Sequence, residues 1–167
     1  MHRKKAVDIM VPITESLRPE TSVKDAVIRL KTTRRSEEKY GVKGLPVVDE
    51  KGKLVGLLSI GDIKKAIYPY YMKEMNLGDV AWDGMLETMA RRLKEKTVGE
   101  IMTTDVPAVP EDAPLMECLD HMMKHDVTRV PVVDSAGRVS GMVYERDLFN
   151  VITDAIFGLE NNAEGGE

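Results

Sequence analysis

A phrase of twenty residues occurs twice in this chain of 167 residues, and the repeat limits the folds open to it. Residues 44–63 read GLPVVDEKGKLVGLLSIGDI, and residues 129–148 read RVPVVDSAGRVSGMVYERDL. The identical positions are a Pro-Val-Val-Asp run, two glycines and an aspartate near the end of each copy. Two copies are too few for a solenoid, which needs at least about three stacked repeats. We therefore expect a pseudo-symmetric pair.

The spacing of the repeat predicts where the copies begin and end. An Ile-Met pair recurs at 9–10 and 101–102, an offset of 92, whereas the twin phrases are offset by 85. The first copy thus holds seven extra residues (92 − 85), which we place in the polar segment 32–43 and interpret as a loop extension. We expect the first repeat at 1–67 and a connection with a helix at 68–97. The second repeat follows at 98–157 and a disordered tail at 158–167.

Each copy predicts the element order β-α-β-β-α. Ser22 with Asp25 is a helix-start pattern in the first copy, and Asp112 with Pro114 opens the matching helix in the second. The Pro-Val-Val-Asp run predicts a strand, the next glycine a hairpin turn, and the following apolar run a return strand. A second helix is expected to begin near Ser59. The expected fold class is α/β, with the two repeats packed sheet to sheet to bury their apolar faces. The first helices have apolar stripes at Val23, Ala26, Val27 and Leu30, and at Leu115, Cys118, Leu119 and Met122.

Composition restricts the classes of partner. Hydrophobic residues make up 43% of the chain and charged residues 31%, the balance of a globular domain. A formal net charge of −4 argues against broad nucleic-acid binding. No apolar run approaches the ~20 residues of a membrane span, and no apolar signal core follows the basic N-terminus. With a single cysteine, Cys118, no internal disulfide can form, so we expect a cytoplasmic protein.

The cysteine and histidine patterns favour neither catalysis nor metal binding. Cys118 falls in an apolar helix stripe without a neighbouring base, which predicts a buried core thiol. His121 and His125 have the four-residue spacing of a two-histidine metal face, but no third ligand is evident. We therefore favour a solvated helix face, and we do not expect an enzyme.

The aspartate near the end of each phrase has two interpretations. Ser59-x-x-Asp62 is a capping box that any helix can use. Alternatively, a carboxylate can accept from both hydroxyls of a ribose diol, and such charge-assisted bonds contribute roughly 1.5–3 kcal/mol. Asp147 follows Tyr144, which is a poor N-cap, so we expect that capping does not explain the second aspartate.

The connection at 68–97 also has two interpretations. Asp83 is placed to cap a helix that carries Leu86, Met89 and Leu93. This helix is either a linker packed on the repeats or, with Trp82 and three nearby tyrosines, a docking surface for a partner chain.

The whole series of motifs resembles a tandem pair of CBS domains, often called a Bateman module. The residues that carry the resemblance are the Ile-Met-Thr at 101–103, the Leu/Val-Pro-Val-Val-Asp strands, the glycine-containing return strands, and the terminal motifs 59–62 and 144–147. Each motif is weak alone, but the complete string occurs in order, twice. The resemblance implies a module that binds adenosine-containing ligands in clefts between the copies and regulates another protein.

The resemblance also implies which residues form the two ligand sites. The Ser/Thr-x-x-Asp motif of one copy contacts ribose and phosphate, strand-start residues of the other copy join it, and the residues around Pro-Val flank the base. The first expected site consists of Ser59, Asp62, Thr103, Thr128, Arg129, Val130 and Pro131. The second, which departs from the family pattern at Tyr144 and Val11, consists of Val11, Gly44, Leu45, Pro46, Tyr144, Arg146 and Asp147.

The expected function is that of a stand-alone regulatory module that binds AMP, ADP, ATP or S-adenosylmethionine and signals to a partner protein. No other cofactor is expected. The alternative is a ligand-free scaffold that dimerises and docks a partner. In either case we expect a homodimer formed through apolar helix positions, namely Ile63, Ile67, Leu148, Ile152 and Ile156.

Overall fold

The chain forms two compact units in the computed structural model, which describes residues 3–36 and 39–159. Unit 1 combines Met1–Thr14 and Lys51–Leu54 with Val106–Glu167, and unit 2 combines Glu15–Glu50 with Val55–Asp105, as far as these residues are described. Each unit therefore contains the opening segment of one repeat and most of the other repeat. Both units mix helices and strands, which confirms the predicted α/β fold class. The sheet-to-sheet packing of the repeats stays a prediction.

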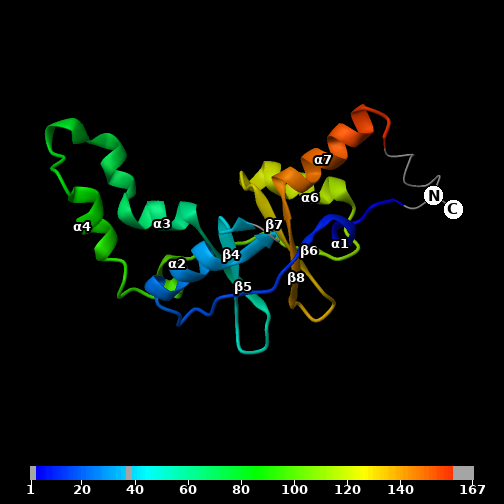
Figure 1. Cartoon of the computed structure of the whole chain (residues 1–167), viewed down its shortest axis with the longest axis horizontal. Helices are drawn as coiled ribbons and strands as arrows, with labels where there is room; N and C mark the ends of the chain where they lie inside the picture. Colours follow the sequence, from blue (N-terminus) through cyan, green and yellow to red (C-terminus); the bar gives the residue numbers. More distant parts are fainter. Residues whose placement is uncertain (1–2, 37–38, 160–167) are drawn as a thin grey trace. The chain divides into compact units, whose positions relative to one another are not determined.

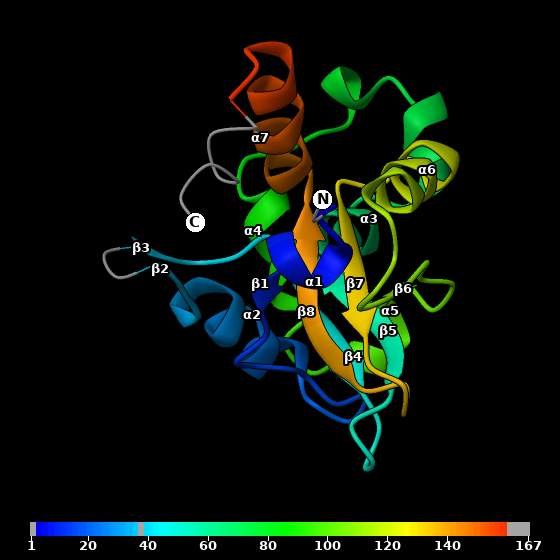
Figure 2. The same cartoon turned by 90° about the vertical axis from the view of Figure 1, so that its right-hand side faces the viewer.

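Unit 1 is built on a four-stranded sheet in the order β1-β8-β7-β6. The hairpin of β7 (Arg129–Val133) and β8 (Val139–Tyr144) is the second twin phrase, and β6 (Val109–Pro110) runs parallel to β7. β1 (Val11–Pro12), from the first repeat, pairs antiparallel with the outer side of β8. Figure 2 shows these strands side by side with α1 (Ala6–Ile9) next to β8.

Two further helices, α6 (Leu115–His125) and α7 (Glu145–Ile156), pack on this sheet and on each other. Cys118 and Met122 of the predicted stripe are buried, with Leu115 and Leu119 packed against the same core. The hairpin turn is fixed by Asp134, whose Oδ1 accepts from the backbone N–H of Ala136 and of Arg138 at 2.9 Å each. The buried residues of this core are Ala6, Val109, Ala113, Cys118, Met122, Val130, Val132, Val143 and Leu148.

Unit 2 repeats the same plan with the first twin phrase. β4 (Gly44–Val48) and β5 (Leu54–Ser59) form its hairpin. Leu17 forms a parallel bridge to Val47, which corresponds to the parallel pairing of β6 with β7 in unit 1. Thr103, from the second repeat, forms an antiparallel bridge to Leu57, which corresponds to the antiparallel pairing of β1 with β8 in unit 1. The first repeat adds two helices to this unit, α2 (Val23–Thr32) and α3 (Ile60–Ile67). Its buried core residues are Leu17, Ala26, Leu30, Leu45, Val47, Leu58 and Val98.

The helix starts in unit 2 follow the predicted signals. Ser22 is the N-cap of α2, and its Oγ accepts from Asp25 N–H at 3.1 Å. Ser59 is the N-cap of α3. Both twin hairpins turn at a glycine with positive φ, +80° at Gly52 and +82° at Gly137, a conformation that other residues adopt only with strain.

The connection differs from its prediction in two respects. α4 (Met85–Arg91) has Gly84 as its N-cap, so the prediction that Asp83 caps this helix is wrong. Gly84 has a φ of +85°, and the turn that it makes moves the helix start one residue past the carboxylate. Two short 3-10 turns precede α4, η1 (Tyr70–Glu74) and η2 (Leu77–Asp79), and Figure 1 shows the chain leaving α3 and returning through α4.

The extra segment of the first repeat is not a plain loop. It contains an antiparallel pair of short strands, β2 (Arg34–Ser36) and β3 (Lys39–Tyr40). The predicted disordered tail falls mainly on residues 160–167, which lie outside the described residues. Within the described ranges, no helix is both long and apolar enough to cross a membrane.

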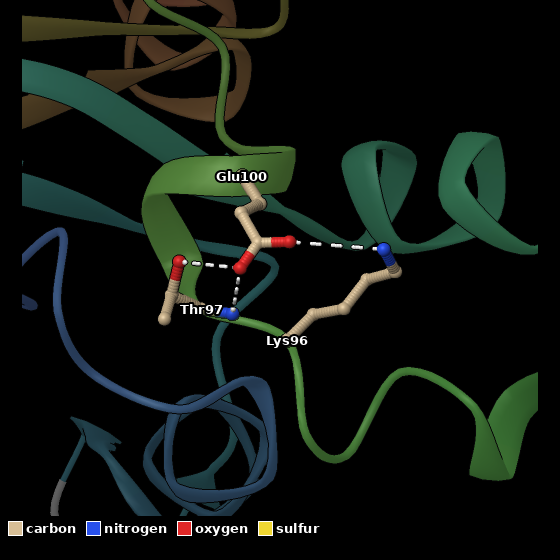
Figure 3. A network of polar contacts seen from close by, with 3 residues as sticks. All are labelled: Lys96, Thr97 and Glu100. Carbon is tan, nitrogen blue, oxygen red and sulfur yellow. Dashed lines mark hydrogen bonds and ion pairs between the residues drawn. The ribbon is translucent and has the colours of Figure 1, made fainter.

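The second repeat enters unit 2 through α5 (Val98–Ile101), one short helix held by its own polar network (Figure 3). Glu100 Oε1 accepts from Thr97 N–H at 3.3 Å and from Thr97 Oγ1 at 3.2 Å, and Lys96 Nζ lies 3.7 Å from Glu100 Oε2. Glu100 thereby occupies the N3 position of a capping box. This helix start sets the direction of the chain that reaches Met102 and Thr103.

Candidate functional site

Asp62 is the centre of a polar cluster at the start of α3. Its carboxylate is buried, with 7% of the residue exposed, and it accepts three hydrogen bonds. Ser59 donates to Oδ2 from its backbone N–H at 2.8 Å and from Oγ at 3.1 Å, and Thr103 Oγ1 donates to Oδ1 at 2.6 Å. The first repeat supplies the carboxylate and one serine, and the second repeat supplies the threonine. The predicted combination of Ser59, Asp62 and Thr103 is therefore present within unit 2.

The backbone of β5 holds Thr103 beside this carboxylate. Leu57 and Thr103 exchange two backbone hydrogen bonds of 2.9 Å each. The close approach requires a glycine at position 56, because a Cβ there would lie 2.7 Å from Met102 Sδ and 2.9 Å from the Thr103 carbonyl oxygen. The glycine conserved between the twin phrases therefore makes room for the opening segment of the other repeat.

Asp147 lies at the equivalent place in unit 1 with fewer polar neighbours. Its Oδ2 accepts from the Tyr144 backbone N–H at 2.8 Å. Val11 pairs with Met142 as Thr103 pairs with Leu57, so Val11 occupies the position of Thr103 without a hydroxyl. The structural reason for the second glycine is the same, since a Cβ at Gly141 would lie 2.8 Å from the Val11 carbonyl oxygen.

The surroundings of Asp147 change the pKa of its carboxyl. Burial raises the pKa of Asp147, because a half-buried carboxylate loses part of its hydration. The Tyr144 backbone N–H and the charge of Arg146 act in the opposite direction on the same pKa, but they do not cancel the effect of burial.

The sequence-based interpretation of Asp147 was wrong. Asp147 does act in capping although Tyr144 is a poor N-cap side chain, because the carboxylate bonds the backbone N–H of residue 144, which any residue but proline provides. Asp62 also starts its helix, and the threonine that bonds it from the second repeat helps to bury it. Capping and ligand binding therefore do not exclude each other at these positions.

The remaining predicted residues lie at the strand starts of the two units. In unit 1, Thr128 and Arg129 lead into β7, and the Thr128 carbonyl accepts from Glu145 N–H at 2.8 Å at the start of α7. Val130 and Pro131 follow, fully buried. The predicted association of these four residues with Asp62 joins different units and stays a prediction.

In unit 2, Gly44, Leu45 and Pro46 are buried along β4, and the Lys43 carbonyl accepts from Ile60 N–H at 2.9 Å at the start of α3. Their predicted association with Tyr144 and Asp147 likewise stays a prediction. The packing of Met102 over Gly56 and of Met10 over Gly141 was not predicted. The repeated Ile-Met pairs and the repeated glycines were the signal that could have revealed it.

Cys118, His121 and His125 lie on α6. Cys118 is buried as predicted, and burial, aided by the charge of Glu117, raises the pKa of its thiol, so that the thiolate needed for nucleophilic attack is disfavoured. His121 Nε2 lies 3.9 Å from Glu117 Oε1 on α6. Across the described part of the chain, no three histidine, cysteine or carboxylate side chains are grouped to hold a metal ion.

Comparison with known proteins identifies the family. The family model described as "CBS domain" matches residues 6–69 and 98–154, which is more than half of the chain. The chain therefore belongs to the CBS-domain family and carries a tandem pair of these domains, as the repeat predicted.

Similar proteins come from different functional settings. The chain is 29% identical over 145 residues to inosine-5'-monophosphate dehydrogenase of Methanocaldococcus jannaschii, with 87% of this chain covered. It spans 23% of that dehydrogenase, so the likeness concerns a module of the enzyme and not the whole protein.

Two solved structures resemble almost the entire chain. CBSX2, solved in complex with AMP, is 25% identical with a TM-score of 0.65, over 90% of this chain and 97% of the other. The same protein is reported from Arabidopsis thaliana. The CBS domain pair of MJ0100, in complex with 5'-methylthioadenosine and S-adenosyl-L-methionine, is 29% identical with a TM-score of 0.63, over 89% and 99% of the two chains.

Proposed function

We propose that this protein is a regulatory CBS-pair module that binds an adenosine-containing ligand at the Asp62 cluster and signals its presence to a partner protein. AMP, ADP, ATP and S-adenosylmethionine are the candidate ligands. The observation that carries the proposal is the hydrogen bond of 2.6 Å between Thr103 and the buried carboxylate of Asp62. It brings a hydroxyl of one repeat to the carboxylate of the other, and a ligand bound there would contact both repeats.

The chemistry of the cluster fits a nucleoside. A carboxylate has about four lone-pair positions, and three donors already hold Asp62 in one orientation. The remaining position accepts from a ribose hydroxyl, and the hydroxyl oxygens of Ser59 and Thr103, whose protons point to Asp62, keep lone pairs that can accept from a ligand O–H or N–H. The cluster lies at the first turn of α3, where the helix dipole favours a phosphate or other anionic group. Two similar CBS pairs have been solved with adenosine-containing molecules, which supports this ligand class.

We also propose a twofold dimer through the helices of unit 1. Of the positions expected to form it, Leu148 is buried in the core of unit 1 and cannot contribute. α6 and α7 pack on each other and expose a group of large apolar side chains, a surface that water disfavours. The most exposed are Met116 (73%), Met123 (74%), Phe149 (60%), Ile156 (72%) and Phe157 (74%). Light scattering at tens of micromolar should give twice the chain mass, and Met123→Lys with Phe149→Lys should give the monomer mass. A monomer mass for the parent contradicts the dimer.

Isothermal titration calorimetry with AMP, ADP, ATP and S-adenosylmethionine tests the ligand proposal. At least one should bind, and a ligand present at about 100 times its Kd should add about 2.7 kcal/mol to the free energy of unfolding. If none of the four binds and none raises the melting temperature, the ligand proposal is wrong. The protein is then better described as the ligand-free scaffold.

A further inference from the structure

The helices α2 and α3 of the first repeat and their counterparts α6 and α7 of the second expose different residue types at matching positions. On the first helices, Lys24 and Lys31 of α2 stand where α6 has Met116 and Met123, at the offset of 92. In the second helix of each repeat, at the offset of 85, Lys64 of α3 corresponds in sequence to Phe149 of α7. One repeat thus has exposed lysines where the other has exposed apolar side chains.

An open groove of about 410 Å³ lies on the lysine-bearing side of unit 2. Apolar side chains from α2, from the segment before β4 and from the first turns of α3 line it together with Lys31 and Lys43, which are both exposed. The apolar residues that line it are Val27, Leu30, Val42, Ile60 and Ile63. Ile60 is 45% exposed although it belongs to this apolar group.

The lysines at and near the groove form no ion pairs with other described residues. Lys24 and Lys31 lie on one face of α2 together with Val27, because residues three and four apart are neighbours on a helix. Lys64 is placed in the same way next to Ile60 on α3. Among the residues that the structure describes, no ion pair is formed by Lys24, Lys31, Lys43 or Lys64.

We propose that this groove binds an acidic amphipathic helix of the regulated partner, with apolar side chains on the floor and carboxylates against the lysines. The proposal rests on the regulatory function proposed above and specifies the partner's chemistry. Complementary charge favours and steers such a complex, whereas two copies of this face in a symmetric dimer would bring like charges together. Small ligands occupy sites that enclose most of their surface, and an open groove suits a helix better.

The probe is a synthetic 14-residue helical peptide with leucines at positions i, i+3, i+4 and i+7 and glutamates on the flanks, labelled for fluorescence anisotropy. Its twin carries lysine in place of each glutamate. The acidic peptide should bind the full chain at least about tenfold more tightly than the basic twin, and its binding should weaken as salt is raised. If neither peptide binds, or both bind equally, the proposal is wrong.

Two variants locate the binding. Lys31→Glu with Lys43→Glu should weaken the acidic peptide at least about tenfold, while Lys4→Glu with Lys94→Glu, which makes the same charge change at exposed positions outside the groove, should leave it within about twofold. Ile60→Glu installs the residue that the second repeat has at this place, Glu145, and should also remove binding while the helix start is kept. Equal effects of the two double variants would mean non-specific attraction, and would overturn the proposal.

A second copy of this chain is the competing occupant, because α7 has an apolar stripe accompanied by Glu145 and Asp154. If Lys31→Glu with Lys43→Glu converts a dimer to a monomer in light scattering, the groove belongs to the dimer and the partner proposal is overturned. Calorimetry of the same variant with AMP, ADP, ATP and S-adenosylmethionine separates this proposal from the ligand proposal. If the variant loses peptide binding but binds the nucleotide as the parent does, both the ligand proposal and the partner-helix proposal are supported. If the parent binds the peptide but no nucleotide, the partner-helix proposal stands and the ligand proposal is wrong.

Discussion

Asp62 and Asp147 occupy equivalent positions in one repeated design, yet their surroundings differ. The strands, glycines and methionines around them correspond residue for residue at offsets of 85 and 92. Asp62 accepts from two hydroxyls and a backbone N–H, whereas the hydrogen bond to Asp147 comes from the Tyr144 backbone N–H. The packing of each opening segment against its glycine is therefore alike in both halves, whereas the two hydroxyls that bond the aspartate are found at Asp62 and not at Asp147 among the described residues.

The largest expected effect concerns the packing that the two halves share. Gly56→Ala and Gly141→Ala should each lower the free energy of unfolding by about 1–3 kcal/mol, because the new Cβ would overlap backbone and methionine atoms of the opening segment. Chemical denaturation of the two single variants measures this. If one variant is as stable as the parent, the two opening segments do not pack against their glycines in the same way, and the claim that both halves share this packing is wrong.

Exchanging Thr103 and Val11, the residues that distinguish the halves, should change the free energy of unfolding by less. The change should be a loss at Thr103 and a gain at Val11. Thr103→Val removes the hydrogen bond to Asp62 and should cost about 1 kcal/mol, since Thr103 is exposed and water can replace part of its bond. Val11→Thr supplies a hydroxyl at the matching place and should stabilise by less than about 1 kcal/mol.

The control for this exchange is Val11→Ala, which shortens the same exposed side chain without adding a hydroxyl. Denaturant melts of the three variants give the comparison. A loss of stability in Val11→Thr equal to that in Val11→Ala would mean that Asp147 is not within reach of residue 11.

The smallest expected effect is a pH dependence that comes from Asp147. Burial raises the folded-state pKa of this carboxyl above its unfolded value of about 4, so the folded state binds the proton more tightly. Its contribution to stability is fully present below the unfolded pKa and is lost as pH rises through the folded pKa. Asp147→Asn keeps an acceptor for the Tyr144 N–H and removes the titration.

The stability of Asp147→Asn relative to the parent should therefore increase from pH 3.5 to pH 7. Thermal melts across this range measure the difference, with Asp134→Asn at the hairpin turn as a control for the loss of one carboxylate. A constant or falling difference would show that burial does not dominate the ionisation of Asp147.

Local signals accounted for much of the fold. Helix starts at Ser22 and Ser59 and the turns at Gly52 and Gly137 depend on a few adjacent residues, so the sequence was sufficient to predict them. The start of α4 was missed because the left-handed turn at Gly84 competes with the cap at Asp83, and the sequence alone does not decide between them.

The candidate site was predictable only in part, because its geometry is not local. The family resemblance indicated that Thr103 joins Ser59 and Asp62, and the structure places the three together. Burial of Asp62 could not be predicted from its own helix, since the covering threonine lies 41 residues away. The hydrogen bond of Asp147 was misjudged because the side chain of Tyr144, and not its backbone, was considered.

We expect ligand binding to depend more on Asp62 than on Asp147, and calorimetric titration of Asp62→Ala and Asp147→Ala tests this most directly. Asp62→Ala should weaken the binding nucleotide by roughly tenfold to a hundredfold, or about 1.5–3 kcal/mol, and Asp147→Ala should weaken it less. Circular dichroism melts must accompany the titration, because three donors lose their acceptor in Asp62→Ala, and Asp62→Asn serves as the folded control. If Asp147→Ala abolishes binding while Asp62→Ala binds like the parent, the ligand occupies the other half. If both variants bind like the parent, the two aspartates only start their helices, and the proposed site is wrong.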